Sequence, residues 1–252
     1  PGQHVLRSIE LIMGEVSNLK RIGEQFSAQD SGTLSIATTH TQARYVLPHA
    51  VAKLRSSYPK VHISLHQATP HEVARMVLDE QAEIGMATES LADYPDLVTL
   101  PCYEWEHVLV VPPSHPLATK ERIGLDDLAI EPLITYHPSF TGRNKIDAAF
   151  AARQLHPRVV LEAIDSDVIK TYVRLGLGVG IVAEMAMRED PGVDLVARPL
   201  GHLFGQSVAR VAFKRGAYLR NFVYKFAETL SDRLSRDLII RAMQGEPSDY
   251  SL

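Results

Sequence analysis

The amino-acid sequence predicts an α/β fold made of two halves, between which the chain crosses twice. Stretches with strand-like alternation are separated by stretches with helical spacing, which is typical of βαβ units with a parallel sheet and helices on both faces. This series occurs twice in the 252 residues and is followed by a late strand and a long helix. We therefore expect crossings near residues 100–104 and 202–206, with a ligand site in the cleft between the halves.

The first segment, residues 1–27, is predicted to be a linker and dimerisation helix. Its apolar residues recur at the 3-4 spacing of a coiled-coil seam, and so short a helix is marginal without a partner. The residues of the seam are Val5, Ile9, Ile12, Val16 and Leu19. The body of the same chain could cover them. We favour a second copy or an upstream segment, because the sequence begins in mid-helix and is expected to be a piece of a longer protein.

The two α/β series follow a polar stretch, residues 28–32, that ends in glycine and predicts a hinge. The first series is predicted as strands 33–38, 61–67 and 84–88 with helices 42–57 and 71–80. The second is predicted as strands 106–111, 132–136, 158–163, 179–182 and 195–198 with helices 143–153 and 167–175. The strand 208–214 then precedes a helix whose apolar face runs from Leu219 to Leu238.

Composition excludes several classes of function. The formal net charge of -4 leaves no basic surface for nucleic acid. The single cysteine, Cys102, excludes an internal disulfide and is expected to be a small buried residue. No apolar run approaches the ~20 residues that span a bilayer, and the first residues do not resemble a signal peptide. We expect a cytoplasmic protein without membrane contact.

The strongest site signal lies where strand 33–38 runs into a helix, because the junction holds Thr39, His40, Thr41 and Gln42. A helix N-terminus offers unpaired N–H groups and a partial positive charge, and Thr and Gln add neutral donors. His40 has no sequence partner and is expected to donate a hydrogen bond. The junction predicts a site for a small oxyanion without fixed positive charge. The alternative is that Thr39 or Thr41 only caps the helix.

Other polar residues are placed to face the same cleft. Thr88 ends a buried strand of the first half, and Thr141 opens a helix of the second. Both could bind a ligand or cap, whereas for Asp165 and Asp167 we favour helix capping. We find no nucleophile elbow, P-loop, metal-ligand set or defensible carboxylate pair. Enzymatic activity is therefore disfavoured, with no catalytic residue, metal or cofactor expected.

Particular runs of residues resemble the linker and effector-binding domain of LysR-type transcriptional regulators. The resemblance extends over nearly the whole sequence and is greatest to the CysB and Cbl branch, which controls sulfur assimilation. The runs are TLSIATTHTQARY at residues 33–45, FTGR at 140–143 and DVIKTYVRLGLGVG at 167–180. The N-terminal winged helix-turn-helix of the family is not in this sequence, so we expect no sequence-specific DNA binding by this chain itself.

The resemblance implies a fold like that of type II periplasmic binding proteins. Two Rossmann-like subdomains would be joined by two crossover strands, with subdomain I at residues 32–101 plus 206–242 and subdomain II at 102–205. The cleft would bind an effector such as sulfate, acetylserine or adenylyl sulfate. By resemblance, the ligand-holding residues are Thr39, Thr41, Gln42, Thr88 and Thr141.

The resemblance also implies partners. We expect a homodimer, which becomes a tetramer in the full-length protein, and contact with promoter DNA and RNA polymerase only through that protein. One alternative is a sulfate-binding carrier of the periplasmic-binding-protein type. A less favoured alternative is an enzyme acting on a small anionic metabolite.

Overall fold

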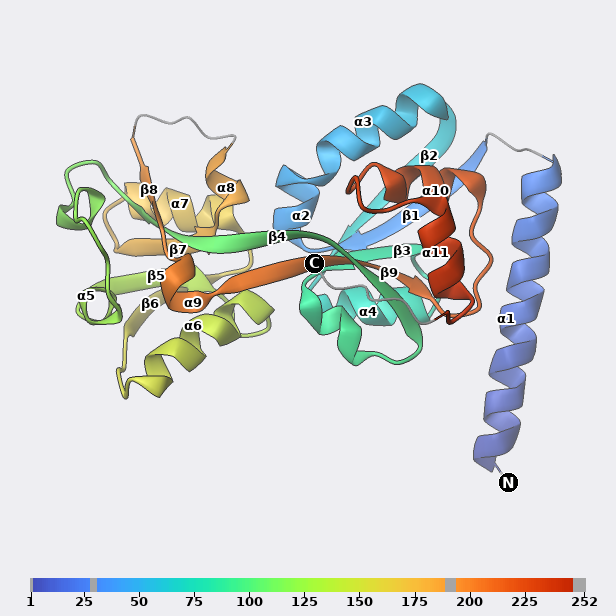
Figure 1. The fold of residues 1–252 in the computed structure, drawn as a ribbon, viewed down its shortest axis with the longest axis horizontal. Coiled ribbons are helices and arrows are strands. Elements are labelled where there is room, and N and C mark those ends of the chain that lie inside the picture. The colour runs from blue at the N-terminus through green and yellow to red at the C-terminus, as the bar shows by residue number, and fades with distance from the viewer. Residues whose placement is uncertain (1, 28–30, 189–193, 247–252) are drawn as a thin grey trace.

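The computed structural model describes residues 2–27, 31–188 and 194–246. Two lobes lie side by side and are joined by the long strands β4 (Leu97–Val111) and β9 (Gln206–Lys214), which run from one lobe into the other (Figure 1). The predicted α/β class with two crossover strands is confirmed. The sheet is not parallel throughout, however, because β4 and β9 are antiparallel to their neighbours.

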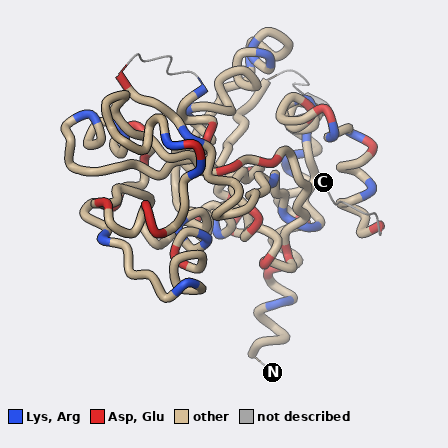
Figure 2. The backbone as a smooth tube through the Cα atoms, turned by 60° about the vertical axis from the view of Figure 1, so that its left-hand side comes forward, with Lys and Arg blue, Asp and Glu red and all other residues tan. Residues whose placement is uncertain are grey.

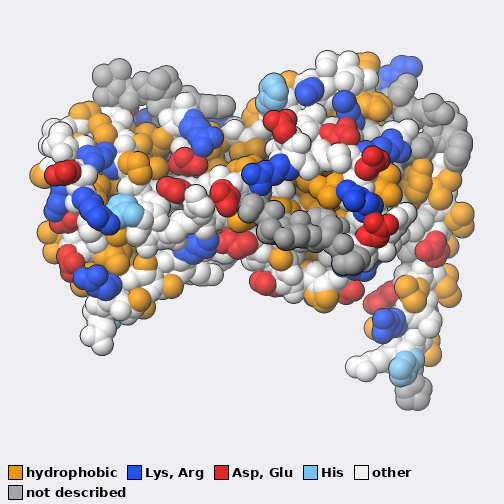
Figure 3. Space-filling model, in the orientation of Figure 1, with side chains coloured by type: hydrophobic (Ala, Val, Ile, Leu, Met, Phe, Trp, Pro, Cys, Tyr) orange, Lys and Arg blue, Asp and Glu red, His pale blue; other side chains and the backbone are white. Residues whose placement is uncertain are grey.

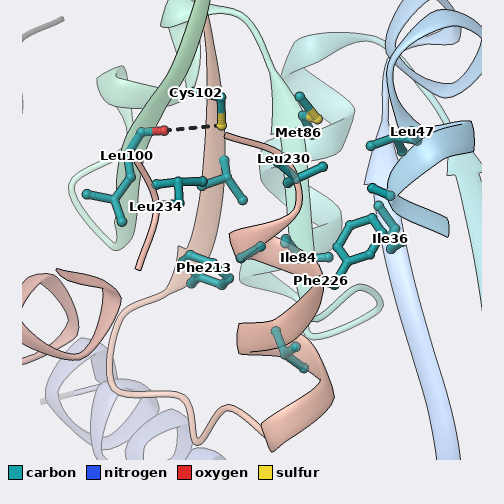
Figure 4. Packing of buried hydrophobic residues seen from close by; sticks show 14 of the residues in the cluster. Ile36, Leu47, Ile84, Met86, Leu100, Cys102, Phe213, Phe226, Leu230 and Leu234 are labelled. Atoms are coloured by element: carbon teal, nitrogen blue, oxygen red, sulfur yellow. Dashed lines mark hydrogen bonds between the residues drawn. The ribbon is translucent and has the colours of Figure 1, made fainter. Parts of the chain in front are cut away.

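The first lobe is built around β1 (Ser31–Thr38), which pairs in parallel with its neighbours β2 (Lys60–Gln67) and β3 (Ile84–Ala87). Its helices are α2 (His40–Tyr45), α3 (Leu47–Ser57), α4 (Pro70–Leu78), α10 (Asn221–Glu228) and α11 (Arg236–Met243). Phe226 of α10 lies beside Ile36 and Ile84 of the sheet (Figure 4). Cys102 is buried in the same core, as predicted. The apolar face that this spacing creates on α10 therefore covers the sheet.

The second lobe repeats the arrangement around β5 (Pro132–Tyr136), which is parallel to both of its neighbours. Its other strands are β6 (Arg158–Ala163), β7 (Val179–Ala183) and β8 (Val196–Pro199), and its longer helices are α6 (Thr141–Ala152) and α7 (Ser166–Arg174).

The two lobes also contain short helices that the sequence pattern does not predict. They are the α-helices α5 (Leu125–Ala129), α8 (Met185–Arg188) and α9 (Gly201–Phe204) and the 3-10 helices η1 (Glu89–Asp93) and η2 (Pro116–Ala118).

Three predicted elements differ from the structure. The helix predicted at 42–57 is interrupted at Val46, because Pro48 near the start of α3 has no N–H to donate to the preceding turn. The prediction of one long last helix is wrong. It is divided into α10 and α11, and Ser235 caps the second helix by accepting a bond from Leu238 N at 3.2 Å. Strand β4 begins at Leu97, well before the predicted residue 106.

The predicted N-terminal helix is confirmed as α1 (Gly2–Ser27), and it contacts the body through its polar side. Ser17 Oγ and Arg21 Nη2 donate to Glu80 Oε2 at 2.6 and 3.0 Å, and Asn18 contacts Gly216 and Tyr218. The seam residues Val16 and Leu19 are 54% and 68% exposed. Figure 3 shows apolar side chains uncovered along α1. The alternative that the body of the same chain covers the seam is therefore wrong.

The predicted hinge, residues 28–32, lies mostly outside the described residues, which resume at Ser31. No helix in the described part of the chain is long and apolar enough to cross a membrane.

Candidate functional site

A pocket lies between the lobes, and five of the six predicted site residues line it. They are Thr39, Thr41, Gln42, Thr88 and Thr141. The rest of the lining is mostly apolar and comes from the second lobe and from β4. It consists of Trp105, Tyr136, Phe140, Gly142, Ala183 and Met185. Segments far apart in the sequence thus converge on one small cavity with a polar and an apolar side.

The junction between β1 and α2 supplies one wall. Thr39 is the residue before α2, but its side chain makes no capping bond. The helical ladder begins with Ala43 N donating to Thr39 O at 3.0 Å, so the N–H groups of the first turn precede the first helical bond. Thr41 Oγ1 lies 3.5 Å from Ser166 Oγ on α7. The capping alternative is therefore wrong for Thr39, whose hydroxyl lies at the pocket.

The opposite wall brings Thr88 and Thr141 together across the cleft. Thr88 Oγ1 donates to Thr141 Oγ1 at 2.7 Å, and Thr141 Oγ1 donates to Ser90 Oγ at 3.2 Å. Neither threonine caps its helix with its side chain. Because Thr88 comes from the first lobe and Thr141 from the second, a ligand that accepts from both hydroxyls would hold the lobes together.

His40 is the one predicted site residue that is not in the pocket lining. Its Nε2 lies 3.2 Å from Asp165 Oδ2 at the start of α7. Asp165 also accepts a bond from Asp167 N at 2.7 Å, so the predicted capping role of Asp165 is confirmed. His40 thus contributes a contact between the lobes beside the pocket.

Asp167 does not cap α7 but joins the lobes through a polar cluster around the buried Lys170. Its carboxylate accepts from Tyr45 OH at 2.5 Å and Arg44 Nε at 3.2 Å, and it pairs with Lys170 Nζ at 2.9 Å. Lys170 is 2% exposed and also donates to Tyr45 OH and Ala186 O. Burial alone would raise the pKa of Asp167, but the bonds from Tyr45 and Lys170 outweigh it and lower the pKa to about 2.

The sequence offered one signal for this cluster. Lys170 lies in α7 at a position whose i−4 and i+3 neighbours, Ser166 and Val173, are both buried. A lysine on such a face needs a buried partner. Asp167 is an i,i+3 neighbour of Lys170 on the same helix, whereas Tyr45 could not be identified as a partner, because it meets Lys170 only when the lobes come together.

The apolar side of the pocket was not predicted. Trp105 comes from the middle of β4 and packs against His107 with ring centroids 5.0 Å apart. A Cβ added at Gly142 would lie 2.9 Å from His107 Nε2 and 3.3 Å from Trp105 Cη2. Only glycine lets the first turn of α6, and with it Thr141, approach β4 this closely. No local pattern distinguishes these residues from any other buried strand.

The electrostatics of the pocket are those of a neutral site. Its described lining contains neither lysine nor arginine, and the nearby Lys170 is paired with Asp167. Over the two lobes Lys and Arg are interspersed with Asp and Glu (Figure 2). The pocket therefore offers hydroxyl, amide and backbone donors to a ligand, which is suited to a small oxyanion.

Comparison with known proteins gives consistent matches. Residues 27–235 match the family described as the LysR substrate binding domain. The chain is 54% identical over 252 residues to the HTH-type transcriptional regulator CysB of Burkholderia cenocepacia, covering 100% of this chain and 80% of that protein. It is 42% identical over 255 residues to the HTH-type transcriptional regulator cbl of Escherichia coli, covering 100% and 81%.

A solved structure supports the same assignment. The crystal structure of the cofactor-binding domain of the Cbl transcriptional regulator matches with a TM-score of 0.79 and 44% identity, covering 85% of this chain and 94% of that one. The relatives are named as transcriptional regulators and not as enzymes, which confirms the prediction that the chain is not an enzyme.

Proposed function

The chain belongs to the family of LysR substrate-binding domains, and from this premise we propose that its cleft binds sulfate or a small sulfur-pathway metabolite as effector. The observation that carries the proposal is the set of threonine hydroxyls and the Gln42 amide around one pocket, whose described lining contains neither lysine nor arginine. Such groups match the oxygens of an oxyanion. Acetylserine and adenylyl sulfate are the two other effectors to be tested against sulfate.

Replacing Thr41 with alanine is expected to weaken sulfate binding by about 1–3 kcal/mol, because a half-buried hydroxyl donor to a charged ligand is lost. Titration calorimetry with sulfate measures the change. Thr33→Ala is the matched control, since Thr33 is an exposed residue at the other end of β1. Equal affinities for Thr41→Ala and Thr33→Ala would contradict the proposed site. Parallel titrations with acetylserine and adenylyl sulfate rank the candidate effectors.

The proposed response to the effector is a change in how the lobes or the subunits are arranged. A ligand that accepts bonds from Thr88 and Thr141 favours the closed lobes over open ones. In the full-length regulator this change would reach promoter DNA and RNA polymerase in the cytoplasm.

The proposed partner of α1 is a second copy of the chain, with a tetramer in the full-length protein. Burial of each exposed seam residue is worth roughly 1.5–3 kcal/mol, which favours pairing. Sedimentation at micromolar concentration is expected to show a dimer that Ile12→Asp weakens, because the aspartate enters the apolar seam. Gln3→Asp, an exposed change on the same helix away from the seam, is expected to leave the dimer intact. A monomeric wild type would contradict this pairing.

A further inference from the structure

Gln42 is held in one orientation by Tyr103, a residue of the long strand β4 that packs against the core of the first lobe. Its side chain is 3% exposed, and its Oε1 accepts a hydrogen bond from the Tyr103 hydroxyl of β4. Within the described part of the chain, no group accepts a bond from the Gln42 amide nitrogen. Since Gln42 lines the pocket, its N–H groups are the part of the carboxamide left for a ligand.

The Tyr103 phenol is a stable donor for this purpose. Burial raises its pKa well above the ordinary value, so the hydroxyl stays protonated at any physiological pH. Its proton is directed to the Gln42 carbonyl oxygen, which engages the carboxamide oxygen of the one amide side chain in the described lining of the pocket.

A β-bulge in β4 turns the side chain of Tyr103 toward Gln42. The pairing of β4 with β9 shifts between Pro101 and Tyr103, so that Cys102 is the extra residue. Leu100 before the bulge and Cys102 within it both lie in the core of the first lobe. Without the extra residue the alternation of the strand would turn Tyr103 to the opposite face.

We propose that Tyr103 is a specificity-determining residue, which makes the pocket select a tetrahedral oxyanion without a proton. This inference rests on the proposed function. Sulfate is fully ionised at neutral pH and accepts hydrogen bonds at every oxygen. Inorganic phosphate keeps at least one proton there, and that proton needs an acceptor. Threonine hydroxyls can turn to present either a proton or a lone pair, but a carboxamide held by its oxygen presents only N–H groups.

The test compares sulfate with inorganic phosphate by titration calorimetry. In the wild type sulfate is expected to bind more tightly than phosphate. Tyr103→Phe releases the Gln42 carbonyl, which can then turn toward the pocket and accept the phosphate proton. The ratio of sulfate affinity to phosphate affinity is expected to fall about 10-fold, the size of one hydrogen bond to a charged ligand. An unchanged ratio would overturn the inference.

Controls separate this effect from a general loss of structure. Tyr58→Phe also removes one hydroxyl, but Tyr58 packs against Phe222 in the first lobe and is expected to keep the wild-type ratio. Tyr103→Leu removes the same hydroxyl in a different shape and is expected to lower the ratio as Tyr103→Phe does. Thermal unfolding of each variant shows that the fold is kept.

A double-mutant cycle tests the mechanism itself. In a Gln42→Met background no carboxamide remains to turn, so Tyr103→Phe is expected to leave the ratio unchanged. An equal fall in both backgrounds would overturn the role of Gln42 orientation. Wild-type protein that binds neither anion would instead contradict the proposed function, so the two failures are distinguishable.

Discussion

Replacing Asp167 with alanine is expected to lower the free energy of unfolding by about 2–3 kcal/mol. The change removes the carboxylate that pairs with Lys170 Nζ at 2.9 Å. Removal of one member of a buried pair usually costs about 3–5 kcal/mol, because the other charge stays out of water. Asp167 is 37% exposed, so solvent can replace part of the interaction. The expected loss is therefore about 2–3 kcal/mol and not the larger loss of a fully buried pair.

Urea unfolding measures this loss, and Asp194→Ala is the matched control. Asp194 pairs with Arg174 at 2.6 Å, but both side chains are substantially exposed. Its replacement is expected to change the free energy of unfolding by less than about 1 kcal/mol. Equal losses in the two variants would show that burial of Lys170 does not set the strength of the Asp167 pair.

His107 is expected to make the protein less stable as the pH falls from 7 to 5. Burial, with a smaller contribution from the charge of Lys145, lowers the pKa of His107 from 6.5 to about 4. In this interval the unfolded chain takes up a proton at His107 and the folded protein does not. The free energy of unfolding therefore decreases with falling pH, by about 2 kcal/mol over the interval.

Urea unfolding at pH 7 and pH 5 tests this prediction in the wild type and in His107→Phe. The phenylalanine keeps an aromatic ring between Trp105 and Phe204 and has no proton to take up. Between pH 7 and pH 5 the free energy of unfolding of the variant is expected to fall by about 2 kcal/mol less than that of the wild type. His156→Asn, at an exposed position, is expected to keep the wild-type dependence. A wild type and His107→Phe with the same pH dependence would contradict the shifted pKa.

Local sequence patterns were sufficient to predict most of the longer helices and strands and one wall of the pocket. Strands β5 and β6 have the predicted bounds, because apolar alternation between turns defines a strand locally. The wall at Thr39, Thr41 and Gln42 follows from a strand that ends where a helix begins, since the free N–H groups lie at that junction whatever packs on it.

The breaks and bulges were not predictable in the same way. The division at Val46 depends on Pro48, which is also tolerated in the first turn of a helix and so gives an ambiguous signal. The bulge in β4 depends on the register with β9, more than 100 residues later in the chain.

The sequence by itself determined the α/β class, the apolar seam of α1 and the hydroxyl-rich junctions, because each is a property of neighbouring residues. The tertiary structure alone decided which junctions share a pocket and which residues complete it. Tyr103 meets Gln42 across 61 residues, and Lys170 meets Tyr45 across 125. Such contacts depend on strand register and lobe closure, so the orientation of Gln42 and the pairing of Lys170 exist only in the folded chain.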